Sequence, residues 1–118
     1  AAIQSRDKSE AALILATLQE LQVDPSAREF LLDHGFGSDR AGSYGVKRWT
    51  RLWNKGFDLW RVRCWKLEDV GLNYRIVYAY LQKGQRFVVL AVLPKSALDY
   101  DNESDPNVTR IRRAYDAL

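Results

Sequence analysis

Basic side chains at strand-like spacing are the residues of this sequence best suited to chemistry. Arg61 and Arg63 lie two apart in an alternating stretch, so we expect both to point to one face of a sheet. Arg75 lies near the start of a second such stretch, and Lys95 follows a third, with Tyr100 five residues later. Because the start of one antiparallel strand lies beside the end of its neighbour, these side chains can converge on one patch. Guanidinium groups bind phosphate bidentately and stay protonated near neutral pH, so such a patch is typical of a phosphate-binding surface.

The distribution of charge favours a polyanionic partner. The net charge of the chain is only +3. Residues 1–39 carry 3 basic and 7 acidic side chains, residues 40–98 carry 12 and 3, and residues 99–118 carry 3 and 5. The middle segment therefore has a charge of +9. Such a concentration suits a nucleic acid, because each neutralised phosphate releases counterions. From charge alone, a solvated surface rich in lysine and arginine is an equal alternative.

Upstream basic and aromatic residues extend the candidate surface, each with a structural alternative. The upstream candidates for nucleic-acid contact are Lys47, Arg48, Trp49, Arg51, Trp53 and Lys55. Of the four tryptophans we assign three to packing and keep Trp49 or Trp53 as a base-stacking surface. Arg61 and Arg63 can also form the solvated face of a strand, and Arg75 can pair with Glu68 or Asp69.

Other chemistries have little support in the sequence. With one histidine and one cysteine, His34 and Cys64, the chain cannot build a structural zinc site or an internal disulfide. We interpret His34 as a surface residue at the end of a helix and Cys64 as a buried thiol. We expect no cofactor and no metal, and a single cysteine suits a reducing cytoplasm. No apolar run approaches the length of a membrane span, and the polar first ten residues are not those of a signal peptide.

Hydrophobic periodicity predicts a single α+β domain over residues 1–118. An N-terminal helical hairpin is expected to pack on a small twisted antiparallel sheet, with a helix at the C-terminus. The third strand is nearly all apolar, so we expect it to be central and buried on both faces. The segment 46–54 fits either a helical turn or an irregular strand. The expected helices are 8–22, 25–34 and 106–118, the expected strands are 59–67, 72–81 and 86–93, and 36–45 is expected to be a loop.

The strand segments resemble the RelE/ParE toxin superfamily. The matching features are a basic-x-basic strand at 59–63, a Tyr-Arg-hydrophobic-hydrophobic-Tyr strand within 72–78, and an apolar strand at 87–92. Lys95 and Tyr100 then match the family's later basic residue and late tyrosine. The resemblance covers roughly half the chain, and it implies a RelE-like fold with the helical hairpin before the sheet.

The resemblance implies a metal-independent endoribonuclease that cleaves messenger RNA in the ribosomal A site. Arg61 and Arg63 would orient the scissile phosphate and assist deprotonation of the 2′-hydroxyl. Arg75 would stabilise developing charge, Lys95 would help the leaving group, and Tyr100 would stack on the nucleotide. Both strand positions are arginine here where RelE itself has lysine, and arginine is a poor general base, so the proton acceptor stays open.

The resemblance also implies a partner and leaves other functions open. A cognate antitoxin protein is expected to cover the helices and the basic patch in a toxin–antitoxin hetero-oligomer, with messenger RNA and the ribosome as further partners. A ParE-like inhibitor of DNA gyrase is the alternative within the superfamily. Outside enzymes, the same basic sheet can be a non-catalytic module that binds RNA or the ribosome.

Overall fold

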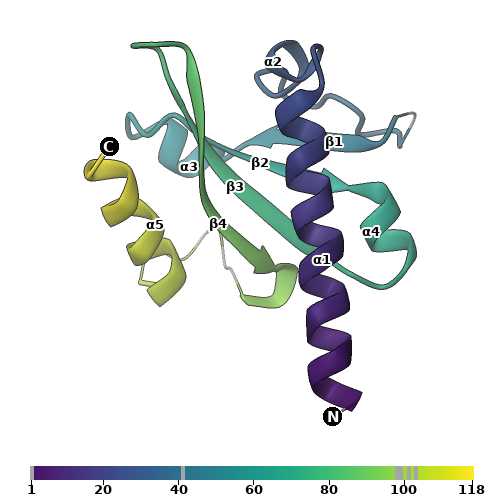
Figure 1. The fold of residues 1–118 in the computed structure, drawn as a ribbon. Coiled ribbons are helices and arrows are strands. Elements are labelled where there is room, and N and C mark those ends of the chain that lie inside the picture. The colour runs from purple at the N-terminus through teal and green to yellow at the C-terminus, as the bar shows by residue number, and fades with distance from the viewer. Residues whose placement is uncertain (1, 41, 98–99, 101, 103) are drawn as a thin grey trace.

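A four-stranded antiparallel sheet in the order β1-β2-β3-β4 organises the fold, which is of the α+β class (Figure 1). The computed structural model describes residues 2–40, 42–97, 100, 102 and 104–118. Its strands are β1 (Tyr44–Arg48), β2 (Leu59–Cys64), β3 (Tyr74–Leu81) and β4 (Arg86–Pro94). Its helices are α1 (Ala2–Val23), α2 (Ala27–Phe30), α3 (Thr50–Trp53), α4 (Trp65–Asp69) and α5 (Pro106–Asp116), with a 3-10 turn η1 (Lys95–Ala97).

The alternation in β2 sorts its side chains onto two faces of the sheet, as the sequence predicts. Trp60, Val62 and Cys64 are buried, whereas Arg61 and Arg63 are half-buried on the opposite face. Residues opposite each other in an antiparallel pair share a face. The side chains of Lys47 on β1 and Val77 on β3, the register partners of Arg61, therefore lie on its face.

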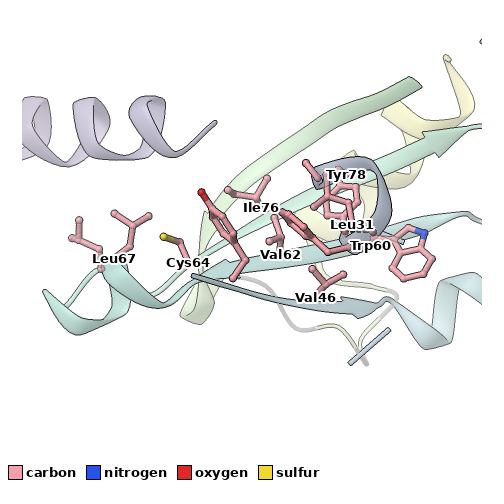
Figure 2. Packing of buried hydrophobic residues seen from close by; sticks show 12 residues of the cluster. Leu31, Val46, Trp60, Val62, Cys64, Leu67, Ile76 and Tyr78 are labelled. Carbon is pink, nitrogen blue, oxygen red and sulfur yellow. Dashed lines mark hydrogen bonds between the residues drawn. The ribbon is translucent and has the colours of Figure 1, made fainter. Parts of the chain in front are cut away.

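Each face of the sheet has its own hydrophobic core. On the first, which we call the α1 face, buried residues such as Val46, Val62 and Ile76 pack with α2, and Ile14 and Leu18 of α1 pack against them (Figure 2). The hydroxyl of the buried Tyr78 donates a hydrogen bond to the carbonyl of Leu31, which fixes the chain after α2 to the sheet.

The second face, which we call the α5 face, is covered by α3 and α5. Leu52 of α3 and Val108 and Ile111 of α5 pack on Val77 and Ala79 of β3. The carboxylate of Asp105 accepts hydrogen bonds from the backbone N–H groups of Asn107 and Val108, so Asp105 caps α5 as its position before proline predicts. This core occupies one end of the α5 face and leaves the arginines of β2 and β3 at the other.

The prediction that the third strand is central and buried on both faces is wrong. Strand β4 is an edge strand that pairs with β3, and its residues are half-buried or exposed, with Val89 47% exposed. The central, fully buried run is Arg75–Ala79 of β3. The difference arises because β4 is the last strand of the meander and pairs with β3, so strand order and not composition decides its place. Strand β1 adds to the other edge, beside β2; it includes Tyr44 and Gly45 of the predicted loop and the start of the undecided segment 46–54, which continues into the short helix α3.

The predicted N-terminal helical hairpin is only partly present. Helix α1 is longer than predicted and begins by Ala2, whereas the second helix is reduced to the single turn α2. Asp24 accepts hydrogen bonds from the backbone N–H and the hydroxyl of Ser26 and so forms a turn instead of capping a long helix. The sheet is therefore covered on this side mainly by one long helix.

The strand predicted over 59–67 ends early, at Cys64. The chain turns there into α4, so Trp65 and Glu68 leave the sheet and fold back toward it. This turn places an acidic side chain beside the arginines, which the strand pattern alone does not predict. Among the described residues, no helix is long and apolar enough to cross a membrane.

Candidate functional site

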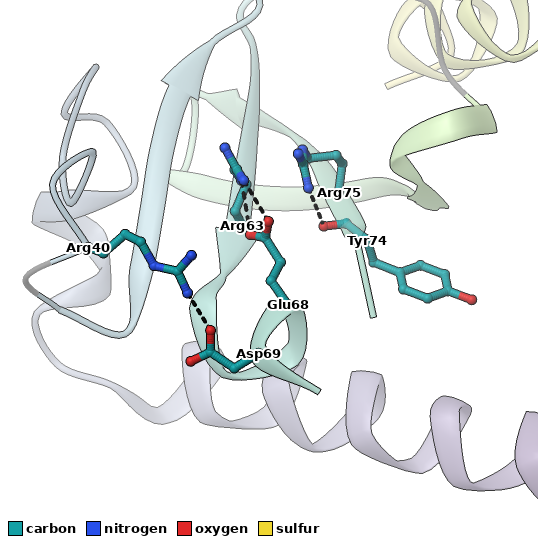
Figure 3. Close-up of polar contacts among 6 residues, drawn as sticks. All are labelled: Arg40, Arg63, Glu68, Asp69, Tyr74 and Arg75. Carbon is teal, nitrogen blue, oxygen red and sulfur yellow. Dashed lines mark hydrogen bonds and ion pairs between the residues drawn. The ribbon is translucent and has the colours of Figure 1, made fainter. Parts of the chain in front are cut away.

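Arg61, Arg63 and Arg75 come together on the α5 face, at the end of the sheet that α5 leaves uncovered. Arg61 and Arg63 point to this face from β2, and Arg75 extends from the adjacent strand β3 beside Arg63 (Figure 3). The positive charges of Arg63 and Arg61 both act on Arg75. We call these three residues the arginine cluster. The convergence predicted for them from strand spacing is therefore present.

Arg75 is the most unusual member of the cluster because it is 3% exposed. Among the described residues its guanidinium donates one hydrogen bond, from Nη1 to the carbonyl of Tyr74 at 3.2 Å. Burial lowers the pKa of Arg75, the like charge of Arg63 lowers it further, and the charge of Glu68 opposes both. A buried charge that is paired by so little costs free energy of folding, and such groups are concentrated at functional sites.

Arg63 is held by a carboxylate from the same chain. Its Nε and Nη2 atoms donate to the two oxygens of Glu68 at 3.0 and 2.5 Å, and its guanidinium lies 4.6 Å from the ring centroid of Trp65. The Glu68 side chain is only 9% exposed. Burial alone would favour the neutral acid, but the hydrogen bonds from Arg63 and the charges of Arg63, Arg75 and Arg40 lower the pKa of Glu68 below its ordinary value of 4.5.

Arg61 is positioned by aromatic residues. Its guanidinium lies 4.2 Å from the ring centroid of Tyr100, and that ring meets the ring of Trp49 edge-on at 4.8 Å. The Trp49 indole N–H donates to the Tyr100 carbonyl at 3.1 Å, which ties Tyr100 to the residue that follows β1. Burial raises the pKa of Tyr100, although the nearby arginines, Arg61 first, oppose the shift.

A second arginine–aromatic contact, between Arg40 and Trp65, borders the cluster on the side of β1. Arg40 lies 4.8 Å from the ring centroid of Trp65 and pairs with the exposed carboxylate of Asp69 (Figure 3). Gly45 makes the close approach of Trp65 possible, because a Cβ at this position would lie 2.5 Å from the indole ring. The glycine thus lets Trp65 lie flat against β1, where the ring supports Arg63.

Lys95 is not brought to the arginine cluster. It is exposed in η1 and borders a separate hollow with Glu10 and Tyr74. Strand β4 ends at Pro94, so Lys95 lies in the 3-10 turn and no longer follows the alternation of the strand, and its backbone N–H donates to the carbonyl of Asn73. The prediction that Lys95 joins the patch is therefore wrong for this structure.

The upstream residues predicted to extend the surface divide between two environments. Lys47 is exposed beside Arg61 on the α5 face, whereas Arg48 alternates to the α1 face and stacks 4.6 Å from the ring centroid of Trp53. Arg51 and Lys55 are exposed in and after α3. Trp53 is 40% exposed, but Trp49 is 2% exposed and belongs to the core, so its interpretation as a possible stacking surface is wrong.

Sequence reasoning missed Glu68 as a member of the site and assigned it to another arginine. Glu68 or Asp69 was the expected alternative partner of Arg75, but these acids pair with Arg63 and Arg40 respectively. The position of Glu68 five residues after Arg63 is the one available signal, and it becomes informative only once α4 is known to turn the chain back.

The arrangement can bind and stabilise an oxyanion. The cluster presents guanidinium groups from two strands, one of them already desolvated, together with one carboxylate. Preorganised donors in such a site stabilise charge without reorganisation during reaction. Within the described part of the chain, no group of three or more His, Cys, Asp or Glu side chains is placed to hold a metal ion. His34 is exposed, and its Nδ1 accepts a hydrogen bond from the Arg48 backbone N–H.

Comparison of the chain with protein-family models, with curated proteins and with solved structures finds no match.

Proposed function

We propose that the protein is an endoribonuclease toxin that cleaves messenger RNA, in the ribosomal A site, without a metal. The observation that carries this proposal is the burial of Arg75 beside Arg63 and Arg61, where one backbone carbonyl is its hydrogen-bond acceptor within the described part of the chain. Folding alone does not require an arginine there, because an apolar side chain would avoid the desolvation of a charge. A phosphate that binds the cluster adds negative charge to that of Glu68, which acts on Arg75 from Arg63's side.

The proposed reaction is an attack by a 2′-hydroxyl on the adjacent phosphate. Charge then develops on the phosphoryl oxygens, and Arg75 stabilises it from the desolvated end of the cluster. Arg61 orients the phosphate with its fork-shaped donors, and Arg63 does so with the guanidinium N–H groups that its contact with Glu68 does not use. Tyr100 acts in this proposal through Arg61, because its ring supports that guanidinium. Lys95 has no role in it, since it lies at a separate hollow.

In this proposal, RNA on either side of the cleaved bond runs over β1 and α3. Lys47 lies beside Arg61 in register, and Arg51 and Lys55 continue the exposed basic surface. Trp53 supplies a partly exposed ring for a base. We propose that these residues give affinity for the strand but take no part in the chemical step.

We also propose that a cognate antitoxin covers the apolar surface between α1 and the hairpin β3–β4. A hollow of about 630 Å³ lies there, lined in part by Leu21, Val23, Leu31, Phe87 and Val89. Val23 is 78% exposed and Val89 is 47% exposed on an open edge strand. Apolar side chains in such a position suit an amphipathic or strand-forming segment of a partner.

The experiment is a cleavage assay with a defined message in a translation extract, with and without ribosomes. We expect the purified chain to cut the message, and Arg75→Met to abolish cutting while retaining RNA binding. Arg86→Ala is the matched control, because it removes an exposed arginine at the distal end of the β3–β4 hairpin. A chain that binds RNA but never cleaves it is the non-catalytic module instead. Inhibition of gyrase supercoiling with messages left intact establishes the ParE-like alternative.

A further inference from the structure

Glu68 is the acidic member of an otherwise cationic site. It extends from α4 into the arginine cluster, where its carboxylate is hydrogen-bonded to Arg63 and close enough to Arg75 for its charge to act there. Its side chain is 9% exposed. The arginines themselves are poor proton acceptors because they remain protonated near neutral pH. The proposed ribonuclease reaction therefore needs a base that the cluster alone does not supply.

We propose that Glu68 is the general base of this site, accepting the proton of the attacking 2′-hydroxyl from its place beside Arg63. This inference rests on the proposed function. In the step, the 2′-oxygen forms a bond to phosphorus and its proton passes to a carboxylate oxygen of Glu68. The bond from phosphorus to the 5′-oxygen breaks, the electron pair leaves with that oxygen, and water donates the proton that completes a 5′-hydroxyl. The products are a 2′,3′-cyclic phosphate and a 5′-hydroxyl end.

Two features of the geometry suit this role. The bidentate contact uses the Nε and Nη2 edge of Arg63 and fixes the carboxylate in one orientation beside the guanidinium. A phosphate bound by the cluster is thereby brought next to a carboxylate, as an in-line attack requires. The carboxylate also stays ionised near neutral pH, because nearby arginines lower its pKa. These are Arg63 on β2, Arg75 on β3 and Arg40 in the loop before β1.

Two other roles for Glu68 make different predictions. If the carboxylate only positions Arg63, its loss weakens phosphate binding, and the fall in cleavage rate follows the fall in affinity. If the carboxylate occupies the place of the phosphate on Arg63, its loss strengthens binding and accelerates cleavage. A base is distinguished from both by a fall in the cleavage rate that weaker binding does not explain, together with the loss of the acid limb of the pH profile.

The test compares the full-length chain with Glu68→Gln, which retains the shape and one acceptor oxygen. Asp69→Asn is the matched control, since it removes the same charge from the next residue of α4. The carboxylate of Asp69 is exposed and pairs with Arg40, outside the arginine cluster. Single-turnover cleavage of a defined message is followed across pH, within the range in which circular dichroism shows each variant folded. Binding is measured separately with an oligonucleotide that has a 2′-deoxy group at the cleaved position.

We expect Glu68→Gln to lose about 10²- to 10⁴-fold in cleavage rate, the contribution typical of a general base. We expect it to bind the deoxy oligonucleotide at least as tightly as the wild type. The wild-type rate should fall at acid pH as Glu68 becomes protonated, and this acid limb should be absent from Glu68→Gln and present in Asp69→Asn.

Three results would overturn the assignment to Glu68 while leaving the proposed ribonuclease intact. They are a Glu68→Gln rate equal to or above that of the wild type, an acid limb that persists in this variant, and a loss of rate explained entirely by weaker binding. A wild-type chain that cleaves no RNA under any condition contradicts the proposed function itself, and the role of Glu68 with it.

Discussion

Replacement of Arg75 by methionine should stabilise the protein and lower its activity about 10²- to 10³-fold. The side chain is 3% exposed and donates one hydrogen bond, to the Tyr74 carbonyl. Arg63 retains its bidentate partner Glu68 when Arg75 is absent, so the substitution leaves no carboxylate without a partner. Methionine fills a similar volume and has no charge to desolvate.

The expected gain in stability follows from the balance between desolvation and pairing. Replacement of buried charged groups by apolar residues of similar volume is commonly neutral or stabilising by about 1–4 kcal/mol. The lower half of this range applies to Arg75, because its carbonyl hydrogen bond is also lost. For a chain of this size each kcal/mol corresponds to roughly 3–5 °C in Tm. We therefore expect Tm to rise by about 0–10 °C.

The expected loss of activity is of the size measured for other donors that stabilise an oxyanion. Loss of one such donor costs about 10²- to 10³-fold in rate. The assays are thermal unfolding followed by circular dichroism and single-turnover cleavage of a defined message. Arg75→Lys separates charge from the bidentate fork, and we expect it to retain part of the activity.

A Tm for Arg75→Met well below that of the wild type would refute the reasoning, because it would mean that the buried guanidinium stabilises the fold. Arg86→Ala, in which an exposed arginine is lost, should leave both Tm and cleavage close to those of the wild type.

Three further predictions test the surroundings of the cluster. Gly45→Ala should destabilise the fold by about 1–3 kcal/mol in chemical denaturation, because its Cβ would meet Trp65, whereas Gly42→Ala, which has open space, should not. The pKa of Glu68 is lowered in the folded state, so its contribution to stability is present above pH 4.5 and is lost as pH falls through the lowered pKa. Wild-type stability should accordingly fall more steeply below pH 4.5 than that of Glu68→Gln, and equal slopes would contradict the pairing. Arg61→Ala should reduce the salt dependence of RNA binding by about one counterion, measured by titration at several salt concentrations, and an unchanged slope would place Arg61 outside the interface.

The sequence predicts the parts of this fold that follow from local periodicity. Alternation in β2 places Arg61 and Arg63 on one face and the buried Val62 on the other, and the structure confirms it. An Asp-Pro pair before α5 likewise predicts its cap, because capping depends only on neighbouring residues.

The features that sequence reasoning missed depend on contacts between distant segments. Strand β4 is as apolar as a central strand, but its place at the edge depends on the order in which the strands pair, and β4 comes last, beside β3. Trp49 is buried because Tyr100, far away in the chain, covers it. Glu68 enters the site because the chain turns at Cys64, before the apolar pattern of the strand has ended.

The most direct test of the account is the chemistry of the cut ends of a defined message. We predict that the chain leaves a 2′,3′-cyclic phosphate and a 5′-hydroxyl, and that a single 2′-deoxy substitution at the cleaved position keeps the message intact. Cleavage of that deoxy message, or products with a 5′-phosphate, would show that the 2′-hydroxyl is not the nucleophile. A message that stays intact with the wild-type chain, in the presence and absence of ribosomes, would contradict the ribonuclease altogether.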